Sequence, residues 1–375
     1  MLILIAPDSF KDCLPADEVA AAIAEGVRRV RPEARIDLCP MADGGPGTVE
    51  AMVRAAGGRL VEVEVADPLR RWRKAAFGLL PGEPAAAVIE MAAAAGLELL
   101  AAHERNPMRT TTYGVGQLIT AALDAGARRL IIGIGGSATT DGGAGCAQAL
   151  GVLLLDRHGH ALCCGVTGGD LASIARIDAG ERDERLAQAE LLVACDVTNP
   201  LLGPRGAAAV FGPQKGATPE MVARLEAGLA NLAAVIERDL AVPVAEMPGG
   251  GAAGGLGAGL VAFAGAQLRR GVEIVADAVG LRRRLAGADL VITGEGRFDG
   301  QSAGGKTAVG VAQLATQCCV PAMCICGQAT PDAPTELFAR VLPLVGPDAT
   351  LEQALAYPRE LLARRAEEAL ASGDS

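Results

Sequence analysis

Apolar residues recur along the chain in two alternating patterns. Short apolar runs typical of buried strands are separated by stretches in which apolar positions return every three or four residues. Residues 15–30 show the second pattern, with Val19, Ile23 and Val27 on one helical face and Asp17 in the first turn, where the helix dipole favours an acid. This stretch is predicted to be an amphipathic helix.

The same two patterns extend over most of the sequence. The runs that predict strands are residues 2–6, 35–39, 60–65, 85–91, 129–134, 152–155, 190–195, 289–293 and 320–326. The patterns that predict helices are residues 15–30, 112–125, 144–150, 220–238, 256–269 and 305–318. Alternating strands and helices predict an α/β fold with largely parallel sheets and helices on both faces.

Length and composition narrow this prediction. A chain of 375 residues exceeds what one hydrophobic core usually serves, so two domains are expected. Half of the residues are hydrophobic but only 2% are aromatic, so the core must consist of Ala, Val, Leu and Ile, as in buried parallel sheets. The net charge of −10, with no basic stripe interleaved with aromatics, argues against nucleic acid as a partner.

Cysteine usage and the apolar runs indicate a compartment. The ten cysteines form no pair of CxxC motifs at zinc spacing, and several lie within apolar runs, which suits a reducing cytosol. The N-terminal apolar run is short and lacks a basic lead, so it is interpreted as a strand rather than a signal peptide. No uninterrupted apolar run is long enough for a membrane span. We expect a cytoplasmic protein with no membrane partner.

The most informative candidate for a ligand-binding site is residues 130–145, LIIGIGGSATTDGGAG. An apolar run ends there in a glycine-rich turn that opens into a helical pattern. Glycines let backbone N–H groups approach an anion closely, and a helix N-terminus adds partial positive charge. The predicted phosphate contacts are Gly135, Gly136, Ser137, Thr139, Asp141, Gly142 and Gly143. Asp141 could also hold a divalent cation. The alternative is a tight strand-to-helix turn with no ligand.

Four further loops at predicted strand ends carry acids or lysines. They are PDSFKDCLP with Ser9 and Lys11, MADGGPGT with Asp43, ACDVTNPLLGPRGAAAVFGPQKG with Asp196 and Lys215, and LVITGEGRFDGQSAGGK with Glu295, Arg297, Asp299 and Lys306. Helix caps, turns and structural ion pairs could each explain one loop. Because parallel strands present their carboxyl ends at one edge, several such loops together favour a ligand site.

Two common mechanisms find little support. The three histidines include His158 and His160 in a polar turn, where we expect them to be solvated, so an acid–base mechanism on histidine is not indicated. The Gly-x-Ser-x-Gly pattern of an α/β-hydrolase is absent from the sequence.

The motifs together resemble the type I glycerate kinases. The matching segments are APDSFK, PMADGG, GIGGSATTDGGAG, ACDVTNPLLGPRGAAAVFGPQKGA, GAAGGLGAGL and TGEGRFDGQSAGGK, which follow the family's order and cover nearly the whole chain. The sequence departs from the family's pattern at Asp12-Cys13, at Pro46, at Thr140 and at Ser302. Pro46 replaces a Glu, which puts a metal or substrate role at that position in doubt.

The resemblance implies ATP-dependent phosphorylation of glycerate with Mg²⁺ in the cytoplasm. It also implies two α/β domains, of which one is discontinuous and the other is inserted into it. We expect the discontinuous domain to comprise residues 1–75 and 285–375, and the inserted domain residues 76–284. The 2-hydroxyl is favoured over the 3-hydroxyl as the acceptor, and the oligomeric state is left open.

A mechanism can be assigned to the candidate residues as a hypothesis. Phosphoryl transfer depends mostly on positioning and charge neutralisation. Asp196 is the first choice for the base and Asp43 the second. The expected roles of the other residues are neutralisation of phosphate or carboxylate by Lys215, Lys11 or Lys306, substrate binding by Ser9, Lys11, Arg297 and Lys306, and Mg²⁺ binding by Asp141, Glu295 or Asp299.

Two other functions are compatible with parts of the sequence. Gly133-Ile-Gly135-Gly-Ser-Ala138 fits the GxGxxA pattern of an NAD-dependent dehydrogenase, with Asp156 as the ribose-binding acid. That interpretation leaves the lysine-bearing loops unexplained. The second alternative is a non-catalytic sensor that binds ATP or a sugar acid.

Overall fold

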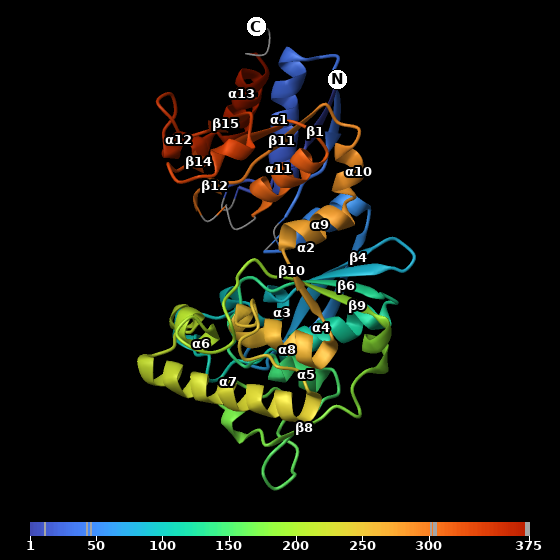
Figure 1. The fold of residues 1–375 in the computed structure, drawn as a ribbon, viewed down its shortest axis with the longest axis vertical. Coiled ribbons are helices and arrows are strands. Elements are labelled where there is room, and N and C mark those ends of the chain that lie inside the picture. Colours follow the sequence, from blue (N-terminus) through green and yellow to red (C-terminus); the bar gives the residue numbers. More distant parts are fainter. Residues whose placement is uncertain (11–12, 43, 46, 301, 303–305, 372–375) are drawn as a thin grey trace. The chain divides into compact units, whose positions relative to one another are not determined.

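The computed structural model describes residues 1–10, 13–42, 44–45, 47–300, 302 and 306–371. Contacts divide the chain into two compact units (Figure 1). Unit 1 contains residues 1–43, 50–56 and 270–375, and unit 2 contains residues 44–49 and 57–269. The predicted domain bounds at 75/76 and 284/285 fall inside strand β4 (Trp72–Leu80) and helix α10 (Leu281–Leu285), and the insertion of one domain into the other stays a prediction.

Unit 1 is built on a five-stranded sheet in the order β15-β13-β11-β1-β2, in which all neighbours are parallel. Its strands are β1 (Leu2–Ile5), β2 (Arg35–Leu38), β11 (Leu290–Thr293), β13 (Ala322–Cys326) and β15 (Arg340–Pro343), with the short pair β12 (Arg297–Phe298) and β14 (Gln328–Ala329) beside them. Its helices are α1 (Ala16–Val30), α9 (Gly271–Ala278), α10, α11 (Thr307–Gln317), α12 (Leu351–Ala356) and α13 (Pro358–Ala371), together with most of α2 (Thr48–Ala56).

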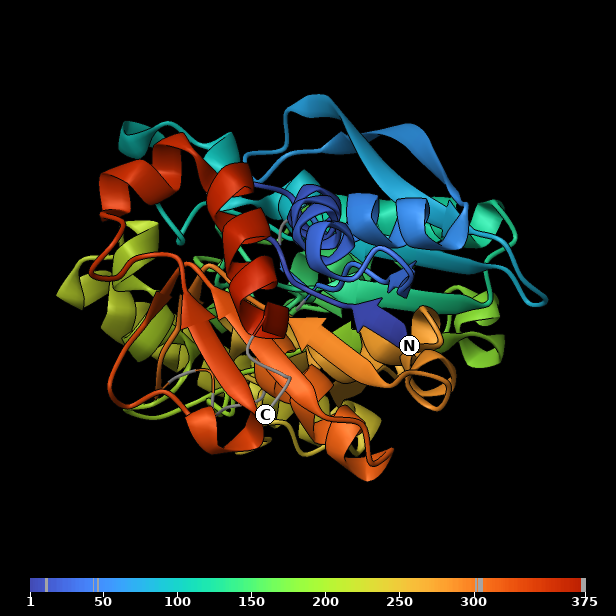
Figure 2. The same ribbon diagram turned by 90° about the horizontal axis from the view of Figure 1, so that it is seen from above.

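The core of unit 1 follows the predicted pattern. Val19, Ile23 and Val27 of α1 are fully buried against the sheet, as their spacing predicts. Helix α13 lies alongside α1, and Leu362 from α13 joins the same apolar cluster (Figure 2). Burial of each such side chain stabilises the fold by about 1.5–3 kcal/mol relative to its exposure.

Unit 2 is built on a six-stranded sheet in the order β10-β9-β6-β5-β4-β3. Its strands are β3 (Arg59–Ala66), β4, β5 (Ala86–Glu90), β6 (Arg129–Gly133), β9 (Glu190–Ala194) and β10 (Gln267–Arg269), with β7 (Leu153–Leu155) and β8 (Arg176–Asp178) as a separate antiparallel pair. Its helices are α3 (Ala92–Ala95), α4 (Tyr113–Asp124), α5 (Ala144–Ala149), α6 (Ala207–Phe211), α7 (Pro219–Leu240) and α8 (Leu256–Ala264). Strands β5, β6, β9 and β10 are parallel, while β3 and β4 run antiparallel at the other edge.

One helix prediction is wrong at its end. The helix predicted for residues 256–269 stops at Ala264, because Gly265 adopts φ +68°, a left-handed conformation that ends helices. Gln267–Arg269 then forms β10, which pairs in parallel with β9. The other predicted helices and strands are present in the structure within a few residues of their expected bounds.

None of the helices in the described part of the chain is both long and apolar enough to span a bilayer.

Candidate functional site

The sheet order of unit 1 creates a crevice at the carboxyl ends of β1 and β11. From β1 the chain proceeds to β2 on one side, whereas β11, β13 and β15 extend the sheet on the other side. Ligands of open parallel sheets bind at such a reversal of strand order. Just beyond the two strands, a backbone hydrogen bond of 2.8 Å joins the Asp8 N–H to the Gly294 carbonyl.

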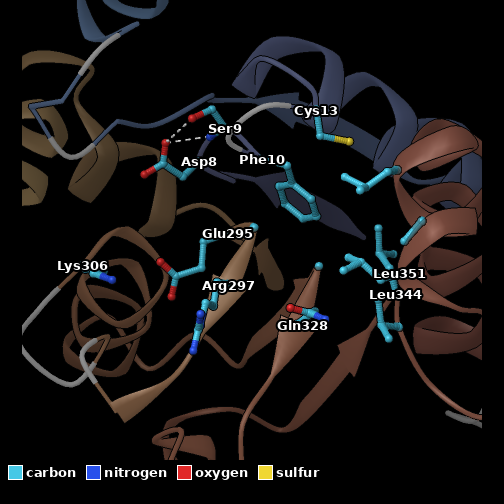
Figure 3. Close-up of a pocket in the computed structure, with 15 residues that line it drawn as sticks. Asp8, Ser9, Phe10, Cys13, Glu295, Arg297, Lys306, Gln328, Leu344 and Leu351 are labelled. Atoms are coloured by element: carbon cyan, nitrogen blue, oxygen red, sulfur yellow. Dashed lines mark hydrogen bonds between the residues drawn. The ribbon is translucent and has the colours of Figure 1, made fainter. Parts of the chain in front are cut away.

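A cavity of about 270 Å³ lies at this position in unit 1 (Figure 3). One end is polar and the other is apolar. The lining residues are Asp8, Ser9, Phe10, Cys13, Glu295, Gly296, Arg297, Lys306, Gly327, Gln328, Leu344, Val345, Leu351, Ala354, Leu355. The cavity thus brings together four sequence-predicted site residues: Ser9, Glu295, Arg297 and Lys306.

Asp8 organises the polar end of the cavity. Its Oδ1 accepts a hydrogen bond from the Ser9 backbone N–H at 2.6 Å, and its Oδ2 accepts one from the Thr307 hydroxyl at 2.5 Å. Thr307 is fully buried in the first turn of α11. The loop after β1 is therefore tied to the beginning of α11, next to Lys306.

Glu295 is a buried carboxyl group in the same cavity. Its residue is only 7% exposed, and its Oε1 accepts a hydrogen bond of 2.7 Å from the buried Ser302 hydroxyl. Burial raises the pKa of Glu295 to about 7; Asp8 and Asp299 add to the rise, while the Ser302 hydrogen bond and the charge of Lys306 oppose it. A cation bound here would stabilise the ionised form.

Asp299 and Arg297 form an ion pair at this edge, with Nε 3.0 Å from Oδ2. The Arg297 side chain is 71% exposed, so the pair itself contributes little stability. The Ser302 hydroxyl accepts a hydrogen bond from the Asp299 backbone N–H at 3.3 Å while donating to Glu295. Ser302 therefore links the two predicted metal ligands.

A further motif in the sequence points to the same place. Residues 300–307, GQSAGGKT, have the spacing G-x4-G-K-[ST] of a phosphate-binding loop, in which the Lys and the hydroxyl meet phosphate and Mg²⁺. The last two letters are Lys306, which caps α11, and Thr307. Residues 301 and 303–305 of this segment lie outside the described residues, as do Lys11 and Asp43.

The donor set of this cavity fits Mg²⁺. Mg²⁺ prefers hard oxygen ligands and is usually bound by one or two carboxylates together with substrate phosphates and water. Asp8 and Glu295 supply such oxygens, and the buried Thr307 hydroxyl donates to Asp8 from behind. Within the described residues no cluster of three His, Cys, Asp or Glu side chains could hold a metal without such additional ligands.

In unit 2, the glycine-rich loop after β6 is held from inside by Asp141. This residue is fully buried, and its Oδ2 accepts hydrogen bonds from the Thr112 N–H at 2.7 Å and the Thr112 hydroxyl at 2.8 Å. The N–H groups of Gly143 and Gly145 also donate to its carboxylate, and the Gly142 N–H donates to the Gly254 carbonyl. Burial raises the pKa of Asp141, and the hydrogen bonds oppose the rise. These N–H groups are already used within the protein.

Lys215 supports the same loop from beneath. Its side chain is buried, and its Nζ donates a 2.6 Å hydrogen bond to the Thr139 carbonyl. Burial lowers the pKa of Lys215 to about 7, while the charge of Asp141 opposes the shift. The hydroxyls of Thr139 and Thr140 are buried beside it without a hydrogen-bond partner. The lysine expected from the sequence to reach a ligand is thus directed into the protein.

The tip of this loop remains accessible within unit 2. Gly135 and Gly136 are exposed, and Ser137 is half-buried. Strands β6 and β9 are neighbours with Gly133 paired to Ala194, so the tip and the exposed Asp196 lie at the same edge of the sheet. The predicted base and the loop tip therefore share one end of unit 2.

Glycines are required where another segment crosses this edge. A Cβ on Gly133 would lie 2.3 Å from the Gly44 carbonyl oxygen, and one on Gly44 would lie 2.4 Å from the Ala194 Cβ. Gly44 therefore lies directly against the carboxyl ends of β6 and β9. Asp43, immediately before it, stays a prediction outside the described residues.

The dinucleotide-binding alternative does not fit unit 2. In that motif the glycine turn opens directly into a helix and the ribose-binding acid ends the next strand of the same sheet. Here α5 begins only at Ala144, and β7 pairs antiparallel with β8 outside the main sheet. Asp156 accepts hydrogen bonds from the N–H groups of His158 and His160 in a local turn.

Comparison with known proteins agrees with this geometry. Residues 3–372 match the model of the glycerate kinase family. The chain is 51% identical to the glycerate kinase of Haemophilus influenzae, with 87% of this chain and 86% of that protein covered. It is 48% identical to the glycerate kinase of Bacillus subtilis over 99% and 97% of the two chains, and 49% identical to the glycerate 2-kinase of Escherichia coli over 88% and 86%.

A solved structure shares the whole fold. A crystal structure of a protein from Salmonella typhimurium LT2 superimposes with a TM-score of 0.90 at 51% identity, covering 99% of this chain and 98% of that one. A family match over nearly the full length, relatives at about half identity and a common fold give one conclusion. This chain belongs to the glycerate kinase family.

Proposed function

We propose that this protein transfers the γ-phosphoryl group of ATP, with Mg²⁺, to the 2-hydroxyl of glycerate in the cytoplasm. Membership of the glycerate kinase family supports the reaction. The choice of the 2-hydroxyl rests on the relative from Escherichia coli, which is a glycerate 2-kinase.

The observation that carries the proposal is the polar end of the cavity in unit 1. It combines Lys306 and Arg297 with the carboxyl groups of Asp8 and Glu295 at a reversal of strand order. Cations that neutralise phosphate, beside carboxylates that suit Mg²⁺, are what phosphoryl transfer requires of a protein.

We assign the nucleotide to unit 1. Lys306 and Ser9 meet its phosphates, and Arg297 lies near them at the mouth of the cavity. Asp8 and Glu295 are the groups that would hold Mg²⁺, which when bound neutralises charge on the phosphates, and the Thr307 hydroxyl positions Asp8. Asp299 positions the surrounding side chains. It forms an ion pair with Arg297, and its backbone N–H donates a hydrogen bond to the Ser302 hydroxyl, which in turn donates to Glu295.

Asp196 accepts the proton of the attacking hydroxyl, as a carboxylate base does in phosphoryl transfer. Gly135 and Gly136 are exposed, and their N–H groups and the Ser137 hydroxyl are the proposed donors to the glycerate carboxylate. Asp141 and Lys215, with Thr139, Gly142 and Gly143, hold this loop in shape rather than contact phosphate or metal.

A direct assay tests the reaction. Purified protein with ATP, Mg²⁺ and D-glycerate is expected to release ADP, measured by a coupled enzyme assay, and phosphorus NMR is expected to identify 2-phosphoglycerate. The same protein without glycerate is the control for ATP hydrolysis. Ligand-induced thermal stabilisation without ADP release would instead favour the sensor, and a product phosphorylated at the 3-hydroxyl would overturn the regiochemistry alone.

A further inference from the structure

The apolar end of the unit 1 cavity is not explained by glycerate. Leu351 and Leu355 of α12 line it and are 49% and 55% exposed, among the most exposed large hydrophobic side chains in the described chain. Exposed leucines in a concave site, rather than scattered on a convex surface, are typical of a surface that a ligand covers.

The remaining walls of this end are also apolar. Phe10 and Leu344 are buried, and Cys13 and Val345 are half-buried around the same space. Figure 3 shows Phe10, Leu344 and Leu351 on the side of the cavity away from Lys306. Glycerate has a charged carboxylate and two hydroxyls on three carbons, so it offers almost no apolar surface for these side chains to cover.

The two ends of the cavity require one occupant with two different ends. One end must be anionic, to meet Lys306 beside the Asp8–Thr307 pair, and the other must be flat and apolar. Gln328 lies between the two ends in Figure 3, and its amide offers both a donor and an acceptor. A purine base has apolar faces and an edge that both donates and accepts hydrogen bonds.

We propose that the apolar end of this cavity, walled by Phe10, Leu344, Leu351 and Leu355, binds the adenine base of the nucleotide, and that Gln328 meets the edge of the base. The inference rests on the proposed function in that the nucleotide is taken to be ATP. It assigns the base to a site formed within unit 1.

Binding of ADP measured by calorimetry tests this inference without turnover. The double variant Leu351→Ser, Leu355→Ser is expected to raise the Kd for ADP by roughly tenfold or more, because the base no longer buries two leucines. Both side chains are half exposed, so their loss removes little of the core. Leu60→Ser is the matched control, since Leu60 on β3 is also 49% exposed but lies outside the cavity.

Two further measurements complete the test. Leu355→Ala, which keeps an apolar side chain and preserves the helix, is expected to give a smaller rise in Kd than the double variant. Adenosine, which lacks phosphates, is expected to compete with ATP and not with glycerate in steady-state kinetics. An unchanged Kd for ADP in the folded double variant, or a raised KM for glycerate alone, would overturn the base assignment. Failure of the wild-type protein to phosphorylate glycerate while it binds ADP would overturn the proposed function instead.

Discussion

Units 1 and 2 both place glycine-rich loops with acids and a lysine after parallel strands, yet the polar side chains take different positions. In unit 1, Glu295 and Lys306 line a cavity at a reversal of strand order. In unit 2, Asp141 and Lys215 are buried behind the loop and hydrogen-bond to its backbone. The parallel strands of unit 2 follow one another across the sheet without such a reversal. Similar loops thus direct their charged side chains either into a cavity or back against their own backbone.

The largest effect is expected at the exposed edge of unit 2. Asp196→Asn removes the proposed base but preserves the size of the side chain. We expect kcat to fall by roughly 100-fold or more, in line with general-base contributions, with little change in the Kd for ADP. Steady-state kinetics and calorimetry measure the two quantities.

Asp178→Asn is a suitable control, because Asp178 lies on β8, away from the main sheet of unit 2. Near-normal turnover in the Asp196 variant would show that Asp196 is not the base. Unit 1 would then bind ligand, while the polar side chains of the unit 2 loop would serve only to support its structure.

The second effect distinguishes Lys306, which lines the cavity of unit 1, from Lys215, which is buried in unit 2. Lys306→Met removes a cation from the cavity of unit 1, and we expect the KM for ATP to rise roughly 10- to 100-fold, as for loss of a hydrogen bond to a charged group. Its fold should be retained, because the Lys306 side chain is not part of the apolar core. Kinetics with varied ATP at saturating glycerate give the value.

Lys74→Met on the exposed face of β4 is the matched control and should leave the KM for ATP unchanged. An unchanged KM for ATP in the Lys306 variant would contradict the placement of the phosphates in unit 1.

The helices and strands could be predicted from the sequence because local patterns of apolar residues determine them. The three-to-four-residue spacing of Val19 and Ile23 marks α1, and apolar runs mark β6 and β9. Strand β4 escaped detection because Arg73 and Lys74 interrupt its pattern near an edge of the sheet. The end of α8 depended on the backbone conformation of one glycine, Gly265.

The candidate site could be predicted from the sequence only in part. The glycine-rich loops and their acids could be identified, but the direction of each side chain depends on tertiary packing. Nothing adjacent in sequence indicates that Thr112 binds Asp141 or that Lys215 reaches Thr139. The apolar end of the unit 1 cavity joins segments far apart in the sequence, such as Phe10 and Leu351.

The third effect concerns the stability of unit 2. Burial lowers the pKa of Lys215 to about 7 from 10.5, so the unfolded chain binds a proton that the folded chain does not throughout that window. Stability should therefore fall as the pH is lowered from about 10.5 towards 7. Lys215→Met removes this dependence, and we expect the melting temperature to vary less with pH between about 7.5 and 9.5 than in the wild-type protein.

Thermal unfolding followed by circular dichroism across this range checks the prediction. Lys74→Met should retain the wild-type dependence, because that lysine is exposed. Equal slopes for the Lys215 variant and the wild-type protein would mean that Lys215 stays protonated in the fold, contrary to its burial.

The smallest effect concerns Glu295 in unit 1. The pH dependence of stability that it causes is opposite in sign to that caused by Lys215. Burial raises the pKa of Glu295 from 4.5 to about 7, so the folded chain binds a proton that the unfolded chain has lost. The stabilisation is complete below about pH 4.5 and is lost as the pH rises through 7. Glu295→Gln should abolish this loss, which amounts to a few degrees in melting temperature on the order expected for such a linkage.

Glu336→Gln, at an exposed position of unit 1, is the control and should behave as the wild-type protein does. Added MgADP should reduce the wild-type loss, because a bound cation stabilises the ionised Glu295, and should have less influence on the slope of the Glu295 variant. The two units then respond to pH in opposite directions, one through a buried acid that faces a ligand and one through a buried base that faces a loop. If the melting temperature of the Glu295→Gln variant changed with pH as steeply as that of the wild-type protein, the Glu295 carboxyl would have an ordinary pKa in the fold. The electrostatic reason for assigning Mg²⁺ to it would then be lost.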